Sequence, residues 1–231
     1  MRRINTIAVC AAAALAVAHL AAQTPSATLA IVGGRVFPVS GEPIANGTVL
    51  VVDGKITAVG ATVAVPTGAT RIDAKGQWVT PGIIHASTRL GLAEIDAVED
   101  TDDSAAAGDH HVAAAFRSWE GLNPSSTLWA PARHAGITSV VAMPGGGLVS
   151  GQAALVDTLE GDRLSMVRKA PVAMVVNLGD PTAGGAKAHG EMLQRMRELF
   201  VDARAWTSRR DAFENGAMRP LAVSGVQLEA L

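Results

Sequence analysis

The alternation of apolar and polar residues changes character near residue 81. Between residues 28 and 80, apolar and polar positions alternate in short runs that turn residues separate: "TLAIVGGRVFPVS", "GTVLVVDGKITAVG" and "TRIDAKGQWV". A period of two is typical of β-strands. The pair Asp53-Gly54, between "VLVV" and "KITAV", predicts a type I′ hairpin turn, because that turn needs positive φ and Asp-Gly tolerates it. Residues 28–80 are therefore predicted to form a small antiparallel sheet domain.

After Pro81-Gly82 the pattern becomes an alternation of strands and helices. Three short apolar runs are predicted to be buried strands: "GIIHA", "ITSVVAMP" and "APVAMVVNLG". Such nearly continuous apolar runs are typical of parallel strands that are covered on both faces. A loop to about Gly121 and a short helix, "SSTLWAPARHAG", which ends at Gly136, separate the first two strands.

A longer amphipathic helix is predicted after the third strand. Its apolar residues recur at steps of three and four: Met192, Leu193, Met196, Leu199, Phe200 and Ala203. This spacing puts them on one face, where the methionines are predicted to fill the core rather than to hold a cofactor. The final segment, "SGVQLEAL", begins like another helix.

These elements predict an α/β protein in two parts. Residues 28–80 would form a small antiparallel sheet, and residues 81–231 the first part, about three strands, of a TIM-type (β/α) barrel. The barrel would be incomplete, because a closed one needs eight strands. An open α/β sheet is the alternative.

The first residues have the pattern of a signal peptide. Arg2 and Arg3 precede an apolar run over residues 7–18, and small residues follow at Ala21-Ala22. We therefore expect residues 1–22 to be removed on export, which predicts a periplasmic or secreted protein. The apolar run is too short to span a bilayer, so no membrane span is expected after cleavage. Cys10, the single cysteine, lies in this segment, so the mature chain would hold no disulfide.

Composition narrows the classes of partner. The 231 residues are 48% hydrophobic and carry 19 basic against 21 acidic side chains, a net charge of -2. This balance offers no basic stripe for nucleic acid or anionic lipid, so neither is predicted as a partner. Aromatic residues make up 3% of the chain, which weakens the case for a stacking platform for bases or sugars. The oligomeric state is left open.

Four segments together resemble the amidohydrolase superfamily, particularly its imidazolonepropionase-like branch. They are "GGRVFPVSGEPIANGTVLVVDGKITAVG", "GQWVTPGIIHASTRLGL", "NPSSTLWAPARHAGITSVVAMPGGGLVSGQAALVDT" and "APVAMVVNLGDP", within a resemblance that covers about residues 29–231. The resemblance implies that residues 28–80 form an antiparallel β-sandwich domain. It also implies a metal-dependent hydrolase, commonly with zinc, that acts on non-peptide carbon–nitrogen bonds of small amide-like substrates.

The resemblance also implies where metal ligands should stand. Members carry two histidines separated by one residue at the end of the first barrel strand, and two such imidazoles can hold one divalent metal. Here the aligned positions hold Ser87 and Arg89, and His85 occupies the place of the preceding acid. Serine is a poor zinc ligand and arginine repels a cation. Val175 stands near a later ligand position, and the remaining ligands would lie beyond Leu231.

We therefore predict no bound metal, no catalytic residue and no hydrolysis for this chain itself. Two alternatives to a hydrolase remain: an exported, non-catalytic binding or scaffold module, and a truncated gene product without an independent role.

Three residues are predicted as candidates for substrate binding, each with a structural alternative. His85 could be a lone ligand or a base beside Ser87, or simply a hydrogen-bonded histidine at a strand end. Arg89 could bind a substrate carboxylate with its planar fork, or pair with the acidic loop that follows. Asn177 could donate into a pocket or cap the backbone.

Two further segments carry chemistry-bearing residues. The acidic loop could bind a cation or be a solvated loop; it contains Glu94, Asp96, Glu99, Asp100, Asp102, Asp103, Asp109 and the pair His110-His111. "PGGGLVSGQ" could suggest a phosphate loop but lacks the Gly-Lys-Ser/Thr ending, so a tight turn between a strand and a loop is predicted instead.

Overall fold

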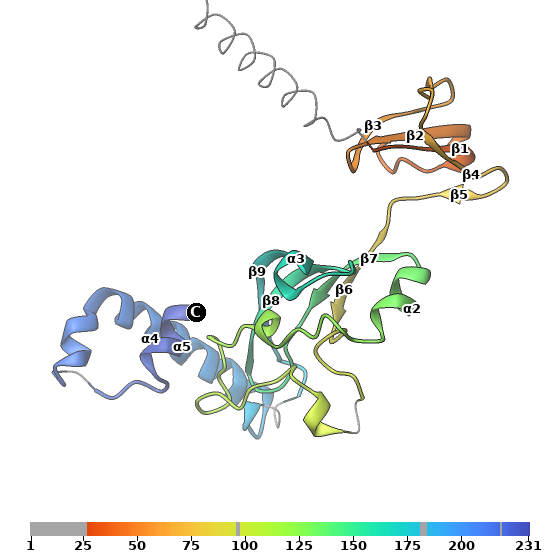
Figure 1. Cartoon of the computed structure of the whole chain (residues 1–231). Helices are drawn as coiled ribbons and strands as arrows, with labels where there is room; N and C mark the ends of the chain where they lie inside the picture. The colour runs from red at the N-terminus through yellow and green to blue at the C-terminus, as the bar shows by residue number, and fades with distance from the viewer. Residues whose placement is uncertain (1–26, 96–97, 181–183, 218) are drawn as a thin grey trace, which may run out of the picture. The chain divides into compact units, whose positions relative to one another are not determined.

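The computed structural model describes residues 27–95, 98–180, 184–217 and 219–231, which form two compact units (Figure 1). The first unit ends at Pro81 and the second is Gly82–Leu231. The predicted signal peptide, residues 1–22, lies outside the described residues.

The first unit contains one five-stranded sheet. Its strands are β1 (Thr28–Val36), β2 (Ile44–Val52), β3 (Lys55–Gly60), β4 (Thr70–Asp73) and β5 (Trp78–Val79). The order is β3-β2-β1-β4, and β5 pairs with the end of β1 beyond β4.

The hairpin predicted at Asp53-Gly54 is confirmed. It joins β2 and β3, which pair antiparallel, and both turn residues have positive φ, 50° at Asp53 and 74° at Gly54. The prediction of a wholly antiparallel sheet is wrong, because β4 and β5 both run parallel to β1. The chain crosses over through residues 61–69 instead of turning back directly, which the alternation of residues could not reveal.

An apolar row crosses the first sheet from β4 to β3. The pairing aligns Ile72, Ile31, Val49 and Val59. Val49 in the middle is buried, whereas Ile72 and Val59 at the ends of the row are exposed. Among the described residues of this unit no second sheet covers the row, so the predicted sandwich is represented by one sheet.

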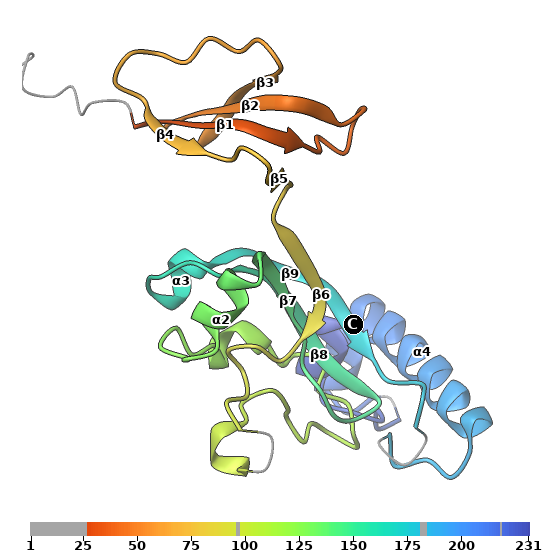
Figure 2. The ribbon, with the colours of Figure 1, turned by 90° about the vertical axis from the view of Figure 1, so that its right-hand side faces the viewer.

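The second unit contains a four-stranded sheet in the order β6-β7-β8-β9 (Figure 2). The strands are β6 (Ile83–Thr88), β7 (Ile137–Ala142), β8 (Val149–Asp157) and β9 (Val167–Val176). The helices are α2 (Trp129–His134), α3 (Arg163–Met166), α4 (His189–Glu214) and α5 (Gly225–Ala230), with 3-10 turns η1 (Glu99–Thr101) and η2 (Ser118–Gly121).

Strand β8 holds this sheet together because both of its edges are bonded. On one edge it pairs antiparallel with β9, and on the other with β7 through residues 154–157. Beyond the end of β7, residues 112–117 take that edge: the Ala113 N–H donates to the Val149 carbonyl, and the Gln152 N–H to the Phe116 carbonyl, both at 2.8 Å. Most of β8 is consequently buried.

The structure corrects the predicted strands in two respects. β8 was not predicted, and it lies antiparallel between β7 and β9, so the third predicted strand does not pair with the second. β9 nevertheless runs in the same direction as β6 and β7, because two antiparallel pairings restore the direction. The prediction that all three are buried is confirmed for β7 and wrong for β6 and β9, which lie at the two edges of the sheet.

Strand β6 is the clearest departure from a buried strand. Ile83 and Ile84 are 55% and 60% exposed. Successive side chains of a strand point to opposite faces, so both faces of β6 lack cover from the described residues.

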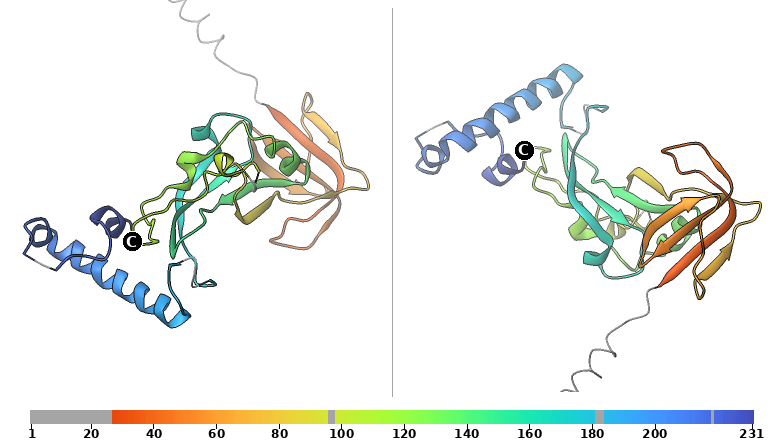
Figure 3. Two further views of the ribbon diagram at one scale, coloured as in Figure 1. Left: turned by 90° about the horizontal axis from the view of Figure 1, so that it is seen from below. Right: turned by 90° about the horizontal axis from the view of Figure 1, so that it is seen from above.

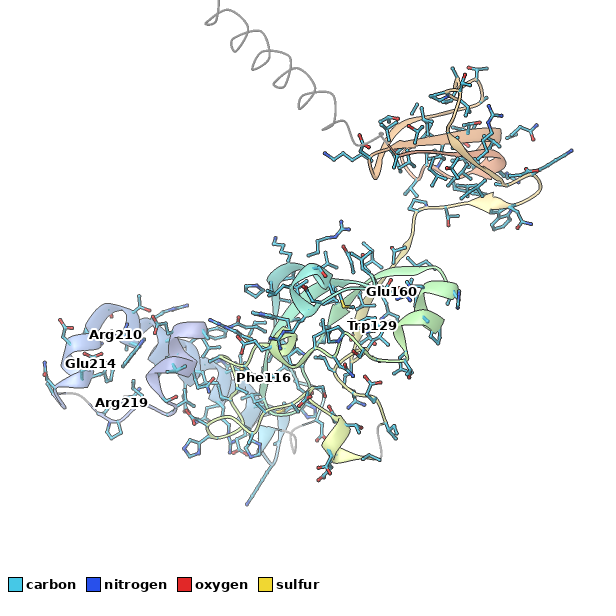
Figure 4. The ribbon with its side chains drawn as sticks, in the orientation of Figure 1. Phe116, Trp129, Glu160, Arg210, Glu214 and Arg219 are labelled. Carbon is cyan, nitrogen blue, oxygen red and sulfur yellow. The ribbon has the colours of Figure 1, made fainter. Side chains whose placement is uncertain are left out.

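Two apolar clusters form the core of the second unit. One gathers Leu92, Leu122, Trp129, Val140 and Val156 between the sheet, α2 and the loop after β6. The Trp129 side chain (Figure 4) donates from Nε1 to the Asn123 carbonyl at 2.9 Å. The other cluster lies around the start of β8 and the helices α4 and α5.

The predicted short helix is α2, and Gly136 follows it with φ of 85°, a typical conformation after a helix. The predicted amphipathic helix is α4, in which Met192 and Leu199 are buried as expected. The prediction is wrong for Leu193 and Phe200, which are exposed.

Helices α4 and α5 pack against each other (Figure 3). Asp202 on α4 holds the segment that connects the two helices. Its buried carboxylate accepts hydrogen bonds from Arg219 and from the Ala222 N–H. The predicted final helix, "SGVQLEAL", is thereby confirmed as α5, with Leu228 in the core. Within the described ranges no helix combines the length and apolarity needed to cross a bilayer.

Asp157 at the end of β8 should contribute to stability. Its buried carboxylate accepts from the Ser139 hydroxyl at 2.7 Å and from Arg168 Nε at 2.8 Å. Asp157→Ala leaves the Ser139 hydroxyl unpaired, and we expect a loss of about 1–3 kcal/mol in the free energy of unfolding by urea. Glu160→Ala, which breaks the exposed ion pair with Arg133, is the control and should cost less than about 1 kcal/mol. Equal losses of unfolding free energy in the two variants would contradict the stabilising role given to Asp157.

Gly91 should tolerate no side chain. It has φ of 77°, and a Cβ atom there would lie 2.2 Å from Trp129 Cζ2. Gly136 has similar φ, 85°, but open space around it. Gly136→Ala should therefore show the backbone cost alone, about 1 kcal/mol, and Gly91→Ala should cost about 1–3 kcal/mol more through overpacking. Matching thermal unfolding curves for the two variants would refute this packing account.

Candidate functional site

The end of the sheet at which β6, β7 and β9 finish is the candidate site. Thr88 at the end of β6 pairs with Ala142 at the end of β7, and Val176 at the end of β9 pairs with Val149. Arg89 and Asn177, each the first residue after its strand, therefore stand at the same end of the sheet. Ligands of open α/β sheets bind at this end.

Arg89 makes an ion pair with the acidic loop. Its Nη1 lies 2.9 Å from Asp102 Oδ2, and Asp102 Oδ1 accepts from the Ser104 N–H at 2.8 Å. The carbonyl of Ser104, which is buried, accepts from the Gly145 N–H at 2.8 Å. The structural alternative stated for Arg89 is thus present, and a chain of contacts links the end of β6 to the loop between β7 and β8.

Hydrogen bonds hold the Asp102 carboxylate in its charged form. The hydroxyl and the backbone N–H of Ser104 lower the pKa of Asp102 below its usual value, and the positive charge of Arg89 adds a smaller effect in the same direction. At neutral pH the Asp102 carboxylate is therefore charged.

His85 and Ser87 are both exposed on β6. The Ser87 N–H donates to His85 Nδ1 at 3.4 Å, a long hydrogen bond that directs this imidazole nitrogen to the backbone. A hydrolytic Ser–His pair needs the hydroxyl, rather than the backbone, to face the imidazole, together with an orienting acid. The geometry matches the structural alternative given for His85.

These residues do not fit a metal ion. The positions aligned with the metal-binding histidines hold the Ser87 hydroxyl and the ion-paired Arg89 cation, and His85 uses Nδ1 locally. Across the part of the chain that the structure describes, no three His, Cys, Asp or Glu side chains gather as a metal site would require.

Asn177 shapes the backbone after β9. Its N–H donates to the Leu148 carbonyl at 3.0 Å, and its side-chain Oδ1 accepts from the Gly179 N–H at 3.2 Å. The second contact is an Asx turn, the capping alternative stated for this residue.

Several carboxylates of the acidic loop form hydrogen bonds with neighbouring segments, so the loop is not simply solvated. Besides Asp102, Glu94 accepts from Asn123 Nδ2 at 3.0 Å and from the Ser126 hydroxyl at 2.9 Å. Asp109 accepts from the Ser224 N–H at 3.0 Å, and hydrogen bonds from Ser224 lower the pKa of Asp109. Asp96 lies outside the described residues, and Glu99, Asp100 and Asp103 are exposed.

The pair His110-His111 forms a tight turn. Both residues have positive φ, 51° and 67°, and Asp109 and Val112 exchange two backbone hydrogen bonds of 2.9 Å across them. The His111 carbonyl accepts from the Leu148 N–H at 2.8 Å, which helps to bring residues 112–117 beside β8. This turn was not predicted, because turns with two central residues at positive φ most often have Gly, Asn or Asp at those positions.

The first part of the glycine-rich run, residues 144–148, is a turn, as predicted, whereas residues 149–152 belong to β8. Gly147 has φ of 65°, and a Cβ atom there would lie 2.7 Å from the His111 carbonyl oxygen. Leu148 is buried directly after it. Close backbone approach therefore accounts for this glycine without a phosphate.

Three surface clefts of the second unit lie away from these residues. One of about 400 Å³ lies between α4 and α5, one of about 480 Å³ between α5 and β9, and one of about 510 Å³ beside His110 and Ser224. None of the three includes His85, Arg89 or Asn177, so the substrate-binding roles of these residues stay predictions.

Comparison with known proteins identifies the fold. The chain is similar to the crystal structure of an amidohydrolase from Thermotoga maritima MSB8, with a TM-score of 0.74 and 21% identity over 87% of this chain. A molinate hydrolase (TM-score 0.33, 24% identity, 51% of this chain and 24% of that one) and a prolidase bound to N-methylphosphonate-L-proline (0.33, 19%, 49% and 25%) also match. No protein-family model and no curated protein matches the sequence.

The predicted resemblance to the amidohydrolase superfamily is thus confirmed at the level of the fold. The match covers 54% of the Thermotoga amidohydrolase, so this chain spans about half of that protein's length.

The Arg89–Asp102–Ser104 contacts should appear in the acid dependence of stability. Because the pKa of Asp102 is lowered in the folded chain, its contribution is complete above the unfolded value of about 3.9 and is lost as the pH falls through the lowered value. Asp102→Asn should therefore lose less stability than the unaltered chain between pH 7 and pH 3 in urea titrations. Asp103→Asn, one residue along, is the control. If Asp102→Asn had the same acid dependence as the unaltered chain, the assignment would be wrong.

Proposed function

We propose that this chain belongs to an amidohydrolase-type protein and supplies scaffold to a small-molecule site without supplying its metal ligands. The whole protein would hydrolyse non-peptide carbon–nitrogen bonds of small amide-like substrates. Any metal would be held by residues other than those at the end of β6. The observation that carries the proposal is the pair of ligand positions, where Ser87 is exposed and Arg89 is ion-paired with Asp102.

A partial TIM-type barrel is part of this proposal. β6, β7 and β9 run in one direction. β6 exposes apolar side chains on both faces and, among the described residues, pairs along one edge only. A strand that is apolar on both faces suits the interior of a covered parallel sheet. The length of the Thermotoga amidohydrolase outside the match also supports further polypeptide that completes the barrel and the sandwich.

The second candidate is a non-catalytic binding or scaffold module of the same fold. The contacts of His85, Arg89 and Asn177 favour it, because all three serve the backbone or an ion pair. Export to the periplasm or the medium is proposed for either function from the pattern of residues 1–22.

Zinc binding tests the proposal. Equilibrium dialysis of the full chain against micromolar zinc should give less than about one bound ion per ten chains, because no two imidazoles face a common point at the end of β6. The double variant Ser87→His with Arg89→His, which installs the aligned pair, should bind more zinc and shows that the assay can detect a site there.

His85→Ala and His134→Ala form the matched pair of controls, since both histidines are exposed and His134 lies on α2. Stoichiometric zinc in the unaltered chain that is lost in His85→Ala but kept in His134→Ala would overturn the proposal. A second outcome separates the hydrolase from the module. If the chain binds no zinc at β6 but hydrolyses amide-like substrates, and if dialysis against a chelator abolishes this activity, the hydrolase is favoured.

A further inference from the structure

A cleft of about 380 Å³ opens on the first unit, away from the residues considered so far. It lies where the pairing of β1 with β2 is irregular, with register shifts on both sides of Gly34. Gly33 and Asn46, which line it, have positive φ of 78° and 49°. Bulges of this kind redirect side chains and are frequent next to functional sites.

An exposed aromatic side chain forms one wall of the cleft. Trp78 on β5 is 73% exposed. Its ring centroid lies 5.2 Å from that of Phe37, and Arg35 Cζ lies 5.4 Å from the Phe37 centroid. Arg35 and Trp78 are also cross-strand partners.

This row of side chains stands on a fixed backbone. The Arg35 N–H donates to the Gln77 carbonyl and the Phe37 N–H to the Val79 carbonyl, both at 2.9 Å. The backbone that carries these side chains therefore needs no ordering when a ligand arrives.

The polar groups of the cleft are available to a ligand. Arg35 forms no ion pair with any carboxylate among the described residues, and the side-chain amides of Asn46 and Gln77 make no hydrogen bond there. All three side chains are exposed and line the cleft. The cleft therefore combines an aromatic face, one unpaired cation and two amides.

We propose that this cleft binds a hydroxylated six-membered ring that carries a carboxylate, the chemistry of a uronic acid. The C–H face of the ring would pack on the Trp78 indole, and the carboxylate would accept from the Arg35 guanidinium. The amides of Asn46 and Gln77 would bind the hydroxyls. The scarcity of aromatic residues argues against an extended platform, whereas a single ring needs one indole. This site is independent of the function proposed for the second unit.

The test uses the full chain and three probes: D-glucuronate, D-glucose without the carboxylate, and benzoate without the hydroxyls. Binding is followed by the shift of the Trp78 indole N–H resonance, which is identified by its loss in Trp78→Ala. We expect glucuronate to bind about tenfold more tightly than either of the other two probes, since each lacks one set of contacts.

Variants separate the contributions. Arg35→Gln should remove the preference for glucuronate over glucose, whereas Arg71→Gln, another exposed arginine of the same unit, should keep it. Trp78→Ala should weaken glucuronate binding about tenfold by calorimetry, and Ile56→Ala, at an exposed apolar position, should not. Failure of glucuronate to bind, equal binding of glucose, or an unchanged preference in Arg35→Gln would each overturn the proposal.

Discussion

The second unit depends on hydrogen bonding along both edges of β8. β9 takes one edge, and the other is shared by β7 and residues 112–117. A strand bonded on both sides cannot shift its register without breaking both ladders, so it fixes the positions of its neighbours. For this reason the loops after β6 and β9 and the loop before β8 meet at one end of the sheet. The His110-His111 turn and Gly147 follow from the same constraint, because both allow the backbone to approach β8 closely.

At that end of the sheet, an ion pair connects the end of β6 to the acidic loop. Arg89 is paired with Asp102, which Ser104 in turn holds in its charged form and connects to the glycine-rich loop. An arginine committed in this way serves neither a metal ion nor, without breaking the pair, a substrate carboxylate. The chain thus combines a fold similar to that of an amidohydrolase with an ion pair at the end of β6.

Local features were predictable from the sequence and distant ones were not. Asp53-Gly54 and Gly136 specify their turns through their own φ preferences, so the hairpin and the end of α2 follow from a few residues. β8 was missed because Gly151 and the three glycines before the strand resembled a loop, and because its burial comes from partners far along the chain. The exposure of β6 depends on which segments pack against it, and an apolar run in the sequence does not identify those segments. Arg89 and Asp102 are thirteen residues apart in an irregular loop, so their pairing was one alternative among several.

The central claim is that the end of β6 is a structural contact and not a metal site. Its most direct test is a crystal structure of the chain grown with zinc, with anomalous diffraction recorded at the zinc absorption edge. The account predicts no anomalous peak near His85 and Ser87, and Arg89 in contact with Asp102. A zinc ion bound by His85, with Arg89 turned away from Asp102, would contradict it.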